Sequence, residues 1–341
     1  MKLTRVLHVG VVGDLPGGMA QVVNEYLTWH FRATTHQAVA STHGRHDLLA
    51  PARWLRAALR LVAFRLSGRR RVLAVHLSQG GSFIREGSLV ALARAIRLPV
   101  AIHVHGSSFV GFSERHPKLV RTVLSKARIV LPLSDATQQA IAHLCLSVPV
   151  TRIRNGVALP AYQAATRNKR ILMAGEIGYR KGADVLLQAW EPLSEAYPDW
   201  ELVLAGPLTM ATLQPRIEEL PRVTWLGPIH HDDLMNLMRT SYIAVLPSRN
   251  EALPMFLLEA MSHGCAAVGT NVGQVADLIS PSTGRLIEPD DVLALKEALN
   301  QLMHDVPETI RHGERARTII EATYSSSAIG EELDRLWLSV L

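Results

Sequence analysis

Short apolar runs of strand length alternate along the whole chain with longer segments of helical periodicity. Runs that are apolar at nearly every position are typical of parallel strands that helices bury on both faces. In the first half, the predicted strands are residues 6–12, 37–41, 72–77, 100–105, 129–132 and 150–153. In the second half, they are residues 170–174, 201–205, 223–226, 243–247 and 266–269. This βαβ rhythm predicts an α/β protein with two doubly wound parallel sheets.

A segment without apolar periodicity separates the two predicted sheets. Residues 155–169 contain an Asn-Gly pair and Pro160, which favour turns. Because 341 residues exceed what one hydrophobic core usually supports, we predict one domain at residues 1–165 and a second at residues 166–322. The helical pattern breaks near residue 322, and residues 323–341 hold a last helix.

Composition excludes several classes of protein. With 48% hydrophobic and 19% charged residues, the chain is neither disordered nor a coiled coil. No apolar run reaches the roughly 18–20 residues that cross a bilayer, and the first residues lack a secretory pattern, so we expect a cytoplasmic protein. Cys145 and Cys265 are too few for a disulfide framework or a cysteine metal site.

Charge is distributed unevenly between the halves. Residues 1–170 carry 24 lysines and arginines against six acidic residues, whereas the remainder carries 12 against 24. Within the basic half, residues 51–72 mix arginines with large apolar residues. This stretch fits a core helix with a solvated arginine face or an interfacial helix on an anionic membrane surface, and the basic half favours the membrane. We expect no nucleic-acid partner, because no recognised motif or aromatic stacking platform accompanies the arginines.

Residues 248–268 combine a strand end, a loop and a helix start. Pro254 suits the first turn of a helix, which would leave the backbone amides near Leu257 and Leu258 free to bind phosphate. Glu251 precedes that turn and Glu259 follows it, so both carboxylates can accept hydrogen bonds from sugar hydroxyls. Alternatively, Glu251 complements the helix dipole and Glu259 lies on a solvated face.

Two further loops suit a diphosphate. Arg180 and Lys181 lie between a strand end and a helix start, where cations and free amides can hold phosphates together. They could also be solvated cations on a helix surface. Gly17 and Gly18 follow the first strand and allow a ligand to approach the backbone, although a tight turn would also use glycine. The GxGxxG spacing of a dinucleotide site is absent.

His103 and His105 are two residues apart on a predicted strand and therefore share a face. His105 is closer to the carboxyl end, where ligands of such sheets bind. We expect no metal, because no third ligand is apparent nearby and no Asp-x-Asp motif is present. An ordinary hydrogen-bonded core histidine remains the alternative for both.

As a whole, residues 248–268 resemble the signature of the retaining family-four glycosyltransferases, the glycogen-synthase-like nucleotide-sugar enzymes of GT-B architecture. The segment has Glu, seven residues, Glu, then Ala-Met and a Gly before a hydrophobic strand. The other agreeing segments are Gly17-Gly18 and residues 174–190, 202–207, 223–248 and 283–302. One departure is Glu176, which stands where the family usually has Arg; Arg180 is the candidate to supply the missing guanidinium.

The resemblance implies two Rossmann-like domains that face each other across a cleft, the first binding the acceptor and the second the nucleotide sugar. It also implies that the last helix packs back on the first domain. The reaction is expected to be retaining and metal-independent, with a UDP- or GDP-sugar donor and no other cofactor. The residues implied in catalysis are His105, Arg180, Lys181 and Glu251, and those implied in donor binding are Gly17, Gly18, Leu257, Leu258 and Glu259.

We therefore expect the chain to transfer a hexose to a hydroxyl of a saccharide acceptor. The basic half and the family's bacterial members favour a lipid-linked acceptor in exopolysaccharide or cell-surface polysaccharide biosynthesis, with the enzyme at the inner face of the plasma membrane. Two alternatives remain. A nucleotide-sugar epimerase or hydrolase would turn over the donor without an acceptor, and a non-enzymatic polyanion-binding protein would bind nucleic acid more tightly than donor sugar.

Overall fold

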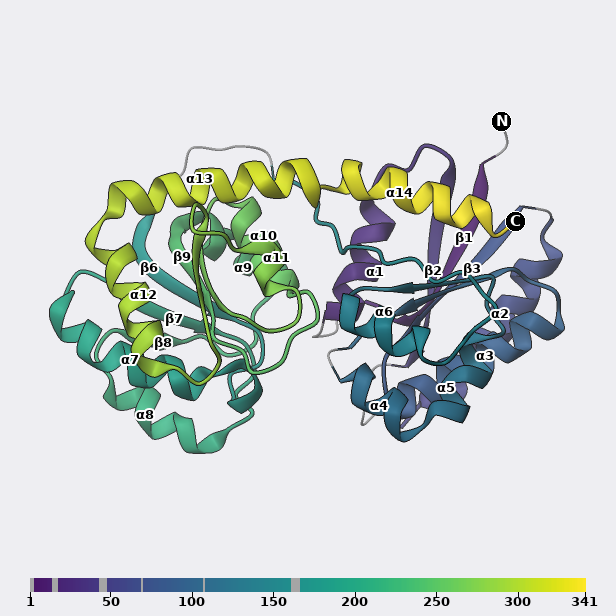
Figure 1. The fold of residues 1–341 in the computed structure, drawn as a ribbon, viewed down its shortest axis with the longest axis horizontal. Helices are drawn as coiled ribbons and strands as arrows, with labels where there is room; N and C mark the ends of the chain where they lie inside the picture. Colours follow the sequence, from purple (N-terminus) through teal and green to yellow (C-terminus); the bar gives the residue numbers. More distant parts are fainter. Residues whose placement is uncertain (1–2, 14–17, 43–47, 69, 107, 161–165) are drawn as a thin grey trace. The chain divides into compact units, whose positions relative to one another are not determined.

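The chain divides into two compact units in the computed structural model, which describes residues 3–13, 18–42, 48–68, 70–106, 108–160 and 166–341 (Figure 1). Unit 1 comprises Met1–Ala158 and Ser326–Leu341, and unit 2 comprises Leu159–Ser325. These divisions differ by a few residues from the boundaries we predicted. The carbonyl of Pro160 accepts a hydrogen bond from Arg317 in unit 2, so the linker joins unit 2 earlier than its sequence suggests.

Within the described residues, unit 1 contains a parallel sheet in the order β2-β1-β3-β4-β5. The strands are β1 (Thr4–Val11), β2 (Thr34–Thr42), β3 (Arg71–Leu77), β4 (Val100–Val104) and β5 (Ile129–Pro132). The helices are α1 (Gly18–Thr28), α2 (Ala50–Leu66), α3 (Gly81–Ala95), α4 (Phe109–Arg115), α5 (Pro117–Leu124), α6 (Asp135–Ala142) and α14 (Ser326–Ser339). The last helix of the chain therefore belongs to unit 1, together with the N-terminal strands.

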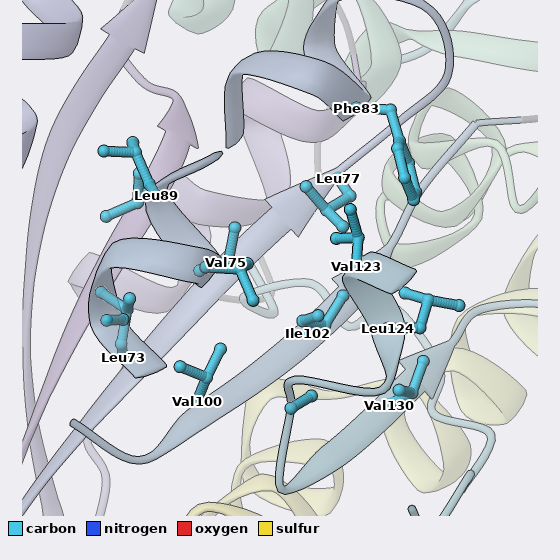
Figure 2. Packing of buried hydrophobic residues seen from close by; sticks show 14 of the residues in the cluster. Leu73, Val75, Leu77, Phe83, Leu89, Val100, Ile102, Val123, Leu124 and Val130 are labelled. Carbon is cyan, nitrogen blue, oxygen red and sulfur yellow. The ribbon is translucent and has the colours of Figure 1, made fainter. Parts of the chain in front are cut away.

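The two faces of the unit 1 sheet differ in chemistry. One face is apolar, where Leu73, Val75 and Ile102 of the strands pack against Phe83 of α3 and Leu124 of α5 (Figure 2). The opposite face carries histidines, and Tyr26 of α1 and Trp337 of α14 lie against them. Side chains alternate between the faces of a strand, so each strand contributes to both layers.

The strand predicted at residues 150–153 is wrong. Val150 forms only an isolated parallel bridge to Val130 at the edge of the sheet. Thr151 donates its backbone N–H to the carbonyl of Val130, and Ile153 donates to that of Pro132. A continuing ladder would also need an N–H from Pro132, which proline lacks, so the pairing stops there.

Within the described residues, unit 2 contains a parallel sheet in the order β11-β10-β9-β6-β7-β8. The strands are β6 (Asn168–Ala174), β7 (Glu201–Ala205), β8 (Val223–Trp225), β9 (Ser241–Leu246), β10 (Ala266–Thr270) and β11 (Gly284–Ile287). The helices are α7 (Ala183–Ala196), α8 (Gln214–Glu219), α9 (His231–Thr240), α10 (Met255–Ser262), α11 (Val275–Leu278), α12 (Val292–His304) and α13 (Val306–Thr323), with 3-10 turns η1 (Tyr179–Lys181) and η2 (Ala211–Leu213).

Strand β11 was not predicted, because its four residues include Arg285 and carry too short an apolar run. Gly284 allows this strand to join the sheet: a Cβ at that position would lie 1.8 Å from the carbonyl oxygen of Ala267 on β10. The other predicted strands are present, with ends within three residues of those expected. The two sheets confirm the prediction of two Rossmann-like, doubly wound parallel-sheet domains. Among the described residues, no helix has both the length and the apolar character required to cross a bilayer.

Candidate active site

The loops after β6 and β9 meet at the carboxyl edge of the unit 2 sheet, where the strand order reverses. In open α/β sheets this reversal is the usual position of a ligand site. Gly182 allows the two loops to touch: its φ is +72°, and a Cβ there would lie 1.9 Å from the carbonyl oxygen of Pro247. The backbone N–H of Arg249 also donates to the carbonyl of Arg180 at 2.9 Å. This contact joins residues 69 positions apart in the sequence.

Lys181 and Glu251 form a buried ion pair at this edge. Nζ of Lys181 lies 2.5 Å from Oε1 of Glu251, and both side chains are about a tenth exposed. Ser248 donates to the same carboxylate oxygen at 3.0 Å, and Nη1 of Arg180 lies 3.6 Å from it. The structure therefore brings together three of the predicted site residues. Glu251 is held by cations and a hydroxyl group, which differs from the alternative of a simple helix-dipole partner.

Arg180 is also engaged with Glu176, the residue that departs from the family pattern. Its Nε and Nη2 donate to Oε2 of Glu176 at 3.1 and 3.0 Å, and Thr209 donates to Oε1 at 3.0 Å. Partial burial raises the pKa of Glu176, but the hydrogen bonds and charge of Arg180 outweigh this effect and lower it below its usual value. The guanidinium of Arg180 thus lies between two carboxylates.

Arg249 is a structural residue of the site that our sequence reasoning missed. Its Nη1 and Nη2 donate to the two carboxylate oxygens of Asp184 at 2.8 Å each, and its Nε donates to Asp290 at 2.7 Å. The guanidinium lies 3.7 Å from the ring centroid of Tyr179. The hydrogen bonds that Arg249 donates to Asp184 raise the pKa of Arg249 above its ordinary value, despite the opposing effect of burial. Arg249 thereby joins the loop after β9 to the start of α7.

The start of α10 differs in register from the prediction. Pro254 is the N-cap residue rather than the first helical residue, and its carbonyl accepts the amide of Leu258 at 3.3 Å. The prediction of a free amide at Leu258 is therefore wrong, because that N–H closes the first helical turn. The amides of Met255, Phe256 and Leu257 have no hydrogen-bond partner among the described residues.

Glu259 lies further along α10 and is 4% exposed, which excludes the solvated face that was its alternative interpretation. Nε2 of His231, at the start of α9, lies 4.0 Å from its Oε1. The glycine loop of unit 1 is only partly described: Gly17 lies outside the described residues, and Gly18 begins α1. A hollow of about 430 Å³, lined by Arg285, Glu308 and His312 among others, contains none of the predicted residues.

His105 lies one residue beyond β4 and is part of a row of histidines. Its backbone N–H donates to the carbonyl of Leu77 at 2.7 Å. The contacts of the row are Nε2 of His105 to Nδ1 of His76 at 2.9 Å, Nε2 of His76 to Nδ1 of His8 at 2.9 Å, and Nε2 of His8 to Nδ1 of His36 at 2.8 Å. This row follows the strand order β4, β3, β1 and β2.

Burial keeps these imidazoles neutral. It lowers the pKa of His105 to about 4 and that of His36 to about 3. Burial also lowers the pKa of His8, His76 and His103 well below 6.5, and neighbouring histidines add to the effect. The sequence pattern indicated only His103 and His105. His8 and His76 also lie in predicted strands, whereas His36 precedes the strand predicted at residues 37–41.

His76 also corrects one premise of the metal argument. Nitrogen atoms of His76, His103 and His105 lie within 4.8 Å of one another, so a third histidine is near the two that we considered. The expectation that the protein uses no metal stays a prediction.

The predicted basic stretch forms α2, which ends at Leu66 rather than continuing to residue 72. One side of the helix is buried through Ala57, Leu61 and Phe64. Arg71 lies in β3 instead, where it is 5% exposed and donates to the carbonyl of Phe64 at 2.5 Å. The arginine-rich segment is therefore divided between a helix and a buried strand.

Residues 168–305 match the family model described as Glycosyl transferases group 1. The similarity to this family covers most of unit 2. This match confirms the family-four-like resemblance found in the sequence, and it includes Arg180, Lys181, Glu251 and Glu259.

Two curated relatives show how far the sequence similarity of this chain extends. The GDP-mannose-dependent monoacylated alpha-(1-6)-phosphatidylinositol monomannoside mannosyltransferase of Corynebacterium glutamicum is 28% identical over 213 residues, which are 57% of this chain and 55% of that protein. The chain therefore spans about half of that relative's length. The alpha-D-kanosaminyltransferase of Streptomyces kanamyceticus is 24% identical over 304 residues, 78% of this chain and 77% of that protein.

A solved structure extends the similarity to both units. The Anabaena protein Alr3699/HepE, crystallised in complex with UDP, matches with a TM-score of 0.76 at 17% identity, over 99% of this chain and 100% of that one. At this identity the match concerns the fold. It confirms the GT-B architecture predicted for this chain.

Proposed function

We propose that the chain is a retaining, metal-independent hexosyltransferase that moves a hexose from a UDP- or GDP-sugar to a hydroxyl of a saccharide acceptor. The observation that carries this proposal is the arrangement of Lys181, Arg180 and Glu251 where the unit 2 strand order reverses. Two cations surround one carboxylate oxygen there, and the loop of that carboxylate leads into a helix with free amides. Cations beside free amides suit a diphosphate.

The proposed chemistry depends on charge that develops during bond cleavage. As the bond to the donor sugar breaks, the diphosphate leaving group becomes more negative. Lys181, Arg180 and the amide of Leu257 would stabilise that charge. Glu251 would exchange its contact with Lys181 for hydroxyls of the donor sugar, while Glu259 would hold the ribose and His105 a hydroxyl of the transferred sugar. The leaving phosphate would help to take the acceptor proton on the same face.

The relatives support the donor and acceptor classes. One is named for GDP-mannose and a phosphatidylinositol mannoside, and a similar structure holds UDP. A nucleotide sugar with either base, and a lipid-linked saccharide acceptor of a polysaccharide or glycolipid pathway, are consistent with these names.

Nucleotide binding and turnover together test the proposal. We expect one of UDP, GDP or ADP to raise the melting temperature, because a ligand at 100 times its Kd stabilises the folded state by about 2.7 kcal/mol. Donor consumption should depend on a saccharide acceptor. No shift with any nucleotide would contradict the proposal, and consumption without an acceptor would favour an epimerase or hydrolase. DNA or RNA binding tighter than donor binding would favour a polyanion-binding protein.

We further propose that α2 attaches the protein to the inner face of the plasma membrane. The observation that favours this role is an exposed apolar stripe at helical spacing: Leu55 is 54% exposed, Leu59 63% and Leu66 78%. Arg56 and Arg60 lie beside the stripe and are also exposed. Apolar side chains flanked by arginines suit the boundary between acyl chains and anionic headgroups.

Vesicle flotation tests this attachment. We expect binding to anionic vesicles at low salt. Leu55→Glu/Leu59→Glu should lower the bound fraction at least about tenfold, because two leucines that would enter the membrane are lost. Ile84→Glu is the matched control, since Ile84 is 62% exposed on α3. Absence of binding by the wild type, or an equal loss in the control, would contradict a role for α2.

A further inference from the structure

The histidine row of unit 1 ends on a carboxylate of the last helix. Nε2 of His36 lies 2.7 Å from Oγ1 of Thr34, and Thr34 donates its hydroxyl hydrogen to Oδ1 of Asp334 on α14. Asp334 also accepts the backbone amides of Arg32 and Ala33 through Oδ2, each at 2.9 Å. Asp334 and Thr34 are both buried. The row therefore connects α14 with His105 through side chains alone.

The carboxylate sets the direction of the hydrogen bonds in the row. An ionised carboxylate only accepts, so the single hydroxyl hydrogen of Thr34 is used toward Asp334. The oxygen of Thr34 must then accept from His36, which places the proton of His36 on Nε2. A neutral imidazole has one donor and one acceptor nitrogen, so Nδ1 of His36 accepts from Nε2 of His8. By the same reasoning, Nδ1 of His8 accepts from Nε2 of His76, and Nδ1 of His76 accepts from Nε2 of His105.

We propose that Asp334 is a positioning residue that holds His105 as the Nε2–H tautomer, so that its unprotonated Nδ1 accepts a hydrogen bond from a hydroxyl group of the bound sugar. The ligand class rests on the proposed function, whereas the tautomer rests on the row alone. No described residue bonds to Nδ1 of His105. A phosphate oxygen would meet this nitrogen as a second acceptor, so the position selects a hydroxyl donor.

His103 provides an internal contrast. Nε1 of Trp337 donates to Nε2 of His103 at 3.3 Å, so a neutral His103 carries its proton on Nδ1. Burial keeps His103 neutral, as it does the row. Two histidines of the same strand region are thus expected in opposite tautomers, each set by its own partner.

Nitrogen-15 NMR of histidine-labelled protein tests the tautomers directly, without any assay of sugar transfer. Two-bond proton–nitrogen correlations distinguish protonated from unprotonated ring nitrogens. We expect the Nε2–H form at His36, His8, His76 and His105, and the Nδ1–H form at His103. A wild-type His105 in the Nδ1–H form would overturn the proposal. A stoichiometric divalent ion bound to His76, His103 and His105 would also overturn it, because coordination would break the row.

Asp334→Asn gives the sharper result. The asparagine oxygen should accept the amides of Arg32 and Ala33, which turns its NH₂ group toward Thr34. Thr34 would then accept from the amide and donate to Nε2 of His36, and the whole row would reverse. We expect His105 to change to the Nδ1–H form. Glu331→Gln is the matched control on the same helix, because Glu331 pairs with Arg32 in an exposed ion pair and should leave every tautomer unchanged.

A second variant and an activity assay complete the test. If Asp334→Asn does not fold, Thr34→Val removes the acceptor of His36 and should give a mixture of tautomers at His105. In a folded Asp334→Asn protein, unchanged tautomers would overturn the proposal. Sugar transfer should fall about three- to tenfold in kcat, as expected for one lost hydrogen bond, with nucleotide Kd unchanged. Reversed tautomers with unchanged kcat would overturn the sugar contact and leave the tautomer assignment in place.

Discussion

Lys181→Ala is expected to lower kcat for sugar transfer by about 10²–10³-fold, because the diphosphate leaving group loses a charged donor at the moment its own charge develops. Steady-state kinetics with saturating donor measures this loss. The nucleotide-induced rise in melting temperature should also decrease, since the same ammonium group would bind the ground-state diphosphate. An activity within twofold of wild type would contradict the role assigned to Lys181.

The control must separate loss of chemistry from loss of stability. Lys181→Ala leaves the buried carboxylate of Glu251 without its closest cation, and such an unpaired charge can cost about 3–5 kcal/mol. Glu251→Gln in the same protein removes that charge, so the double variant should regain stability and remain inactive. Lys169→Ala is the matched single variant, because Lys169 pairs with Asp199 in an exposed part of unit 2. We expect it to keep full activity.

Lowering the pH from 7 to 5 is expected to unfold unit 1 before unit 2. An unfolded histidine takes up a proton near pH 6.5, whereas His105 does so at about 4 and His36 at about 3 in the folded unit. Between these values the unfolded chain binds more protons, so the free energy of unfolding falls as the pH falls. Each such histidine contributes about 1.4 kcal/mol per pH unit, and these two together about 4 kcal/mol at pH 5.

The other buried histidines of unit 1 add to this loss, because the pKa of His8, His76 and His103 is also lowered. A single domain is stable by only about 5–15 kcal/mol, so unit 1 should unfold near pH 5. In unit 2, burial lowers the pKa of His263 to about 4, which removes a smaller amount of stability over the same range. Carboxylates with a lowered pKa, such as Glu176, change the free energy of unfolding only at lower pH, where an unfolded glutamate is protonated.

Hydrogen exchange read by peptide mass spectrometry resolves the two units in this experiment. Exchange protection in β1, β3 and β4 should fall between pH 6.5 and 5, after correction for the intrinsic rate. His36→Gln should reduce the pH dependence by about 2 kcal/mol over this interval, because one titrating group is removed. His30→Gln, at an exposed histidine outside the row, should not. Unit 1 protection that is constant from pH 7 to 5 would contradict the prediction.

Local chemistry along the chain was enough to predict most of the fold. Buried strands such as 201–205 and 129–132 have the ends expected from their apolar runs, because a strand covered on both faces is apolar at most of its positions. The two errors involve the sheet edges. Residues 150–153 look like a strand but meet Pro132, and β11 is short and partly polar but is held by β10 at Gly284. Pairing at an edge depends on the neighbouring strand, which a local pattern does not contain.

The site was predicted only in part, because a local pattern contains the loops but not the contacts between them. Each loop had a recognisable local pattern, since Arg180, Lys181 and Glu251 are charged residues between a buried strand and the start of the next helix. Their contacts could not be derived, because they depend on β6 lying beside β9 in the sheet. Arg249 was overlooked because a single arginine in a loop has no distinguishing local pattern, and its role comes from Asp184 and Asp290. Leu258 was assigned a free amide because the exact start of α10 depends on backbone geometry at Pro254.

The sequence by itself therefore determined two parallel α/β sheets, the loops that carry charge and the resemblance to a glycosyltransferase family. These properties follow from hydrophobic period and residue order, which are local. Only the tertiary structure decided which charges meet and that the histidines form one row. Those hydrogen bonds join His8 to residues 28 and 68 positions away, and Thr34 to a carboxylate 300 positions away. Strand order brings such groups within 3 Å, and strand order is a property of the whole fold.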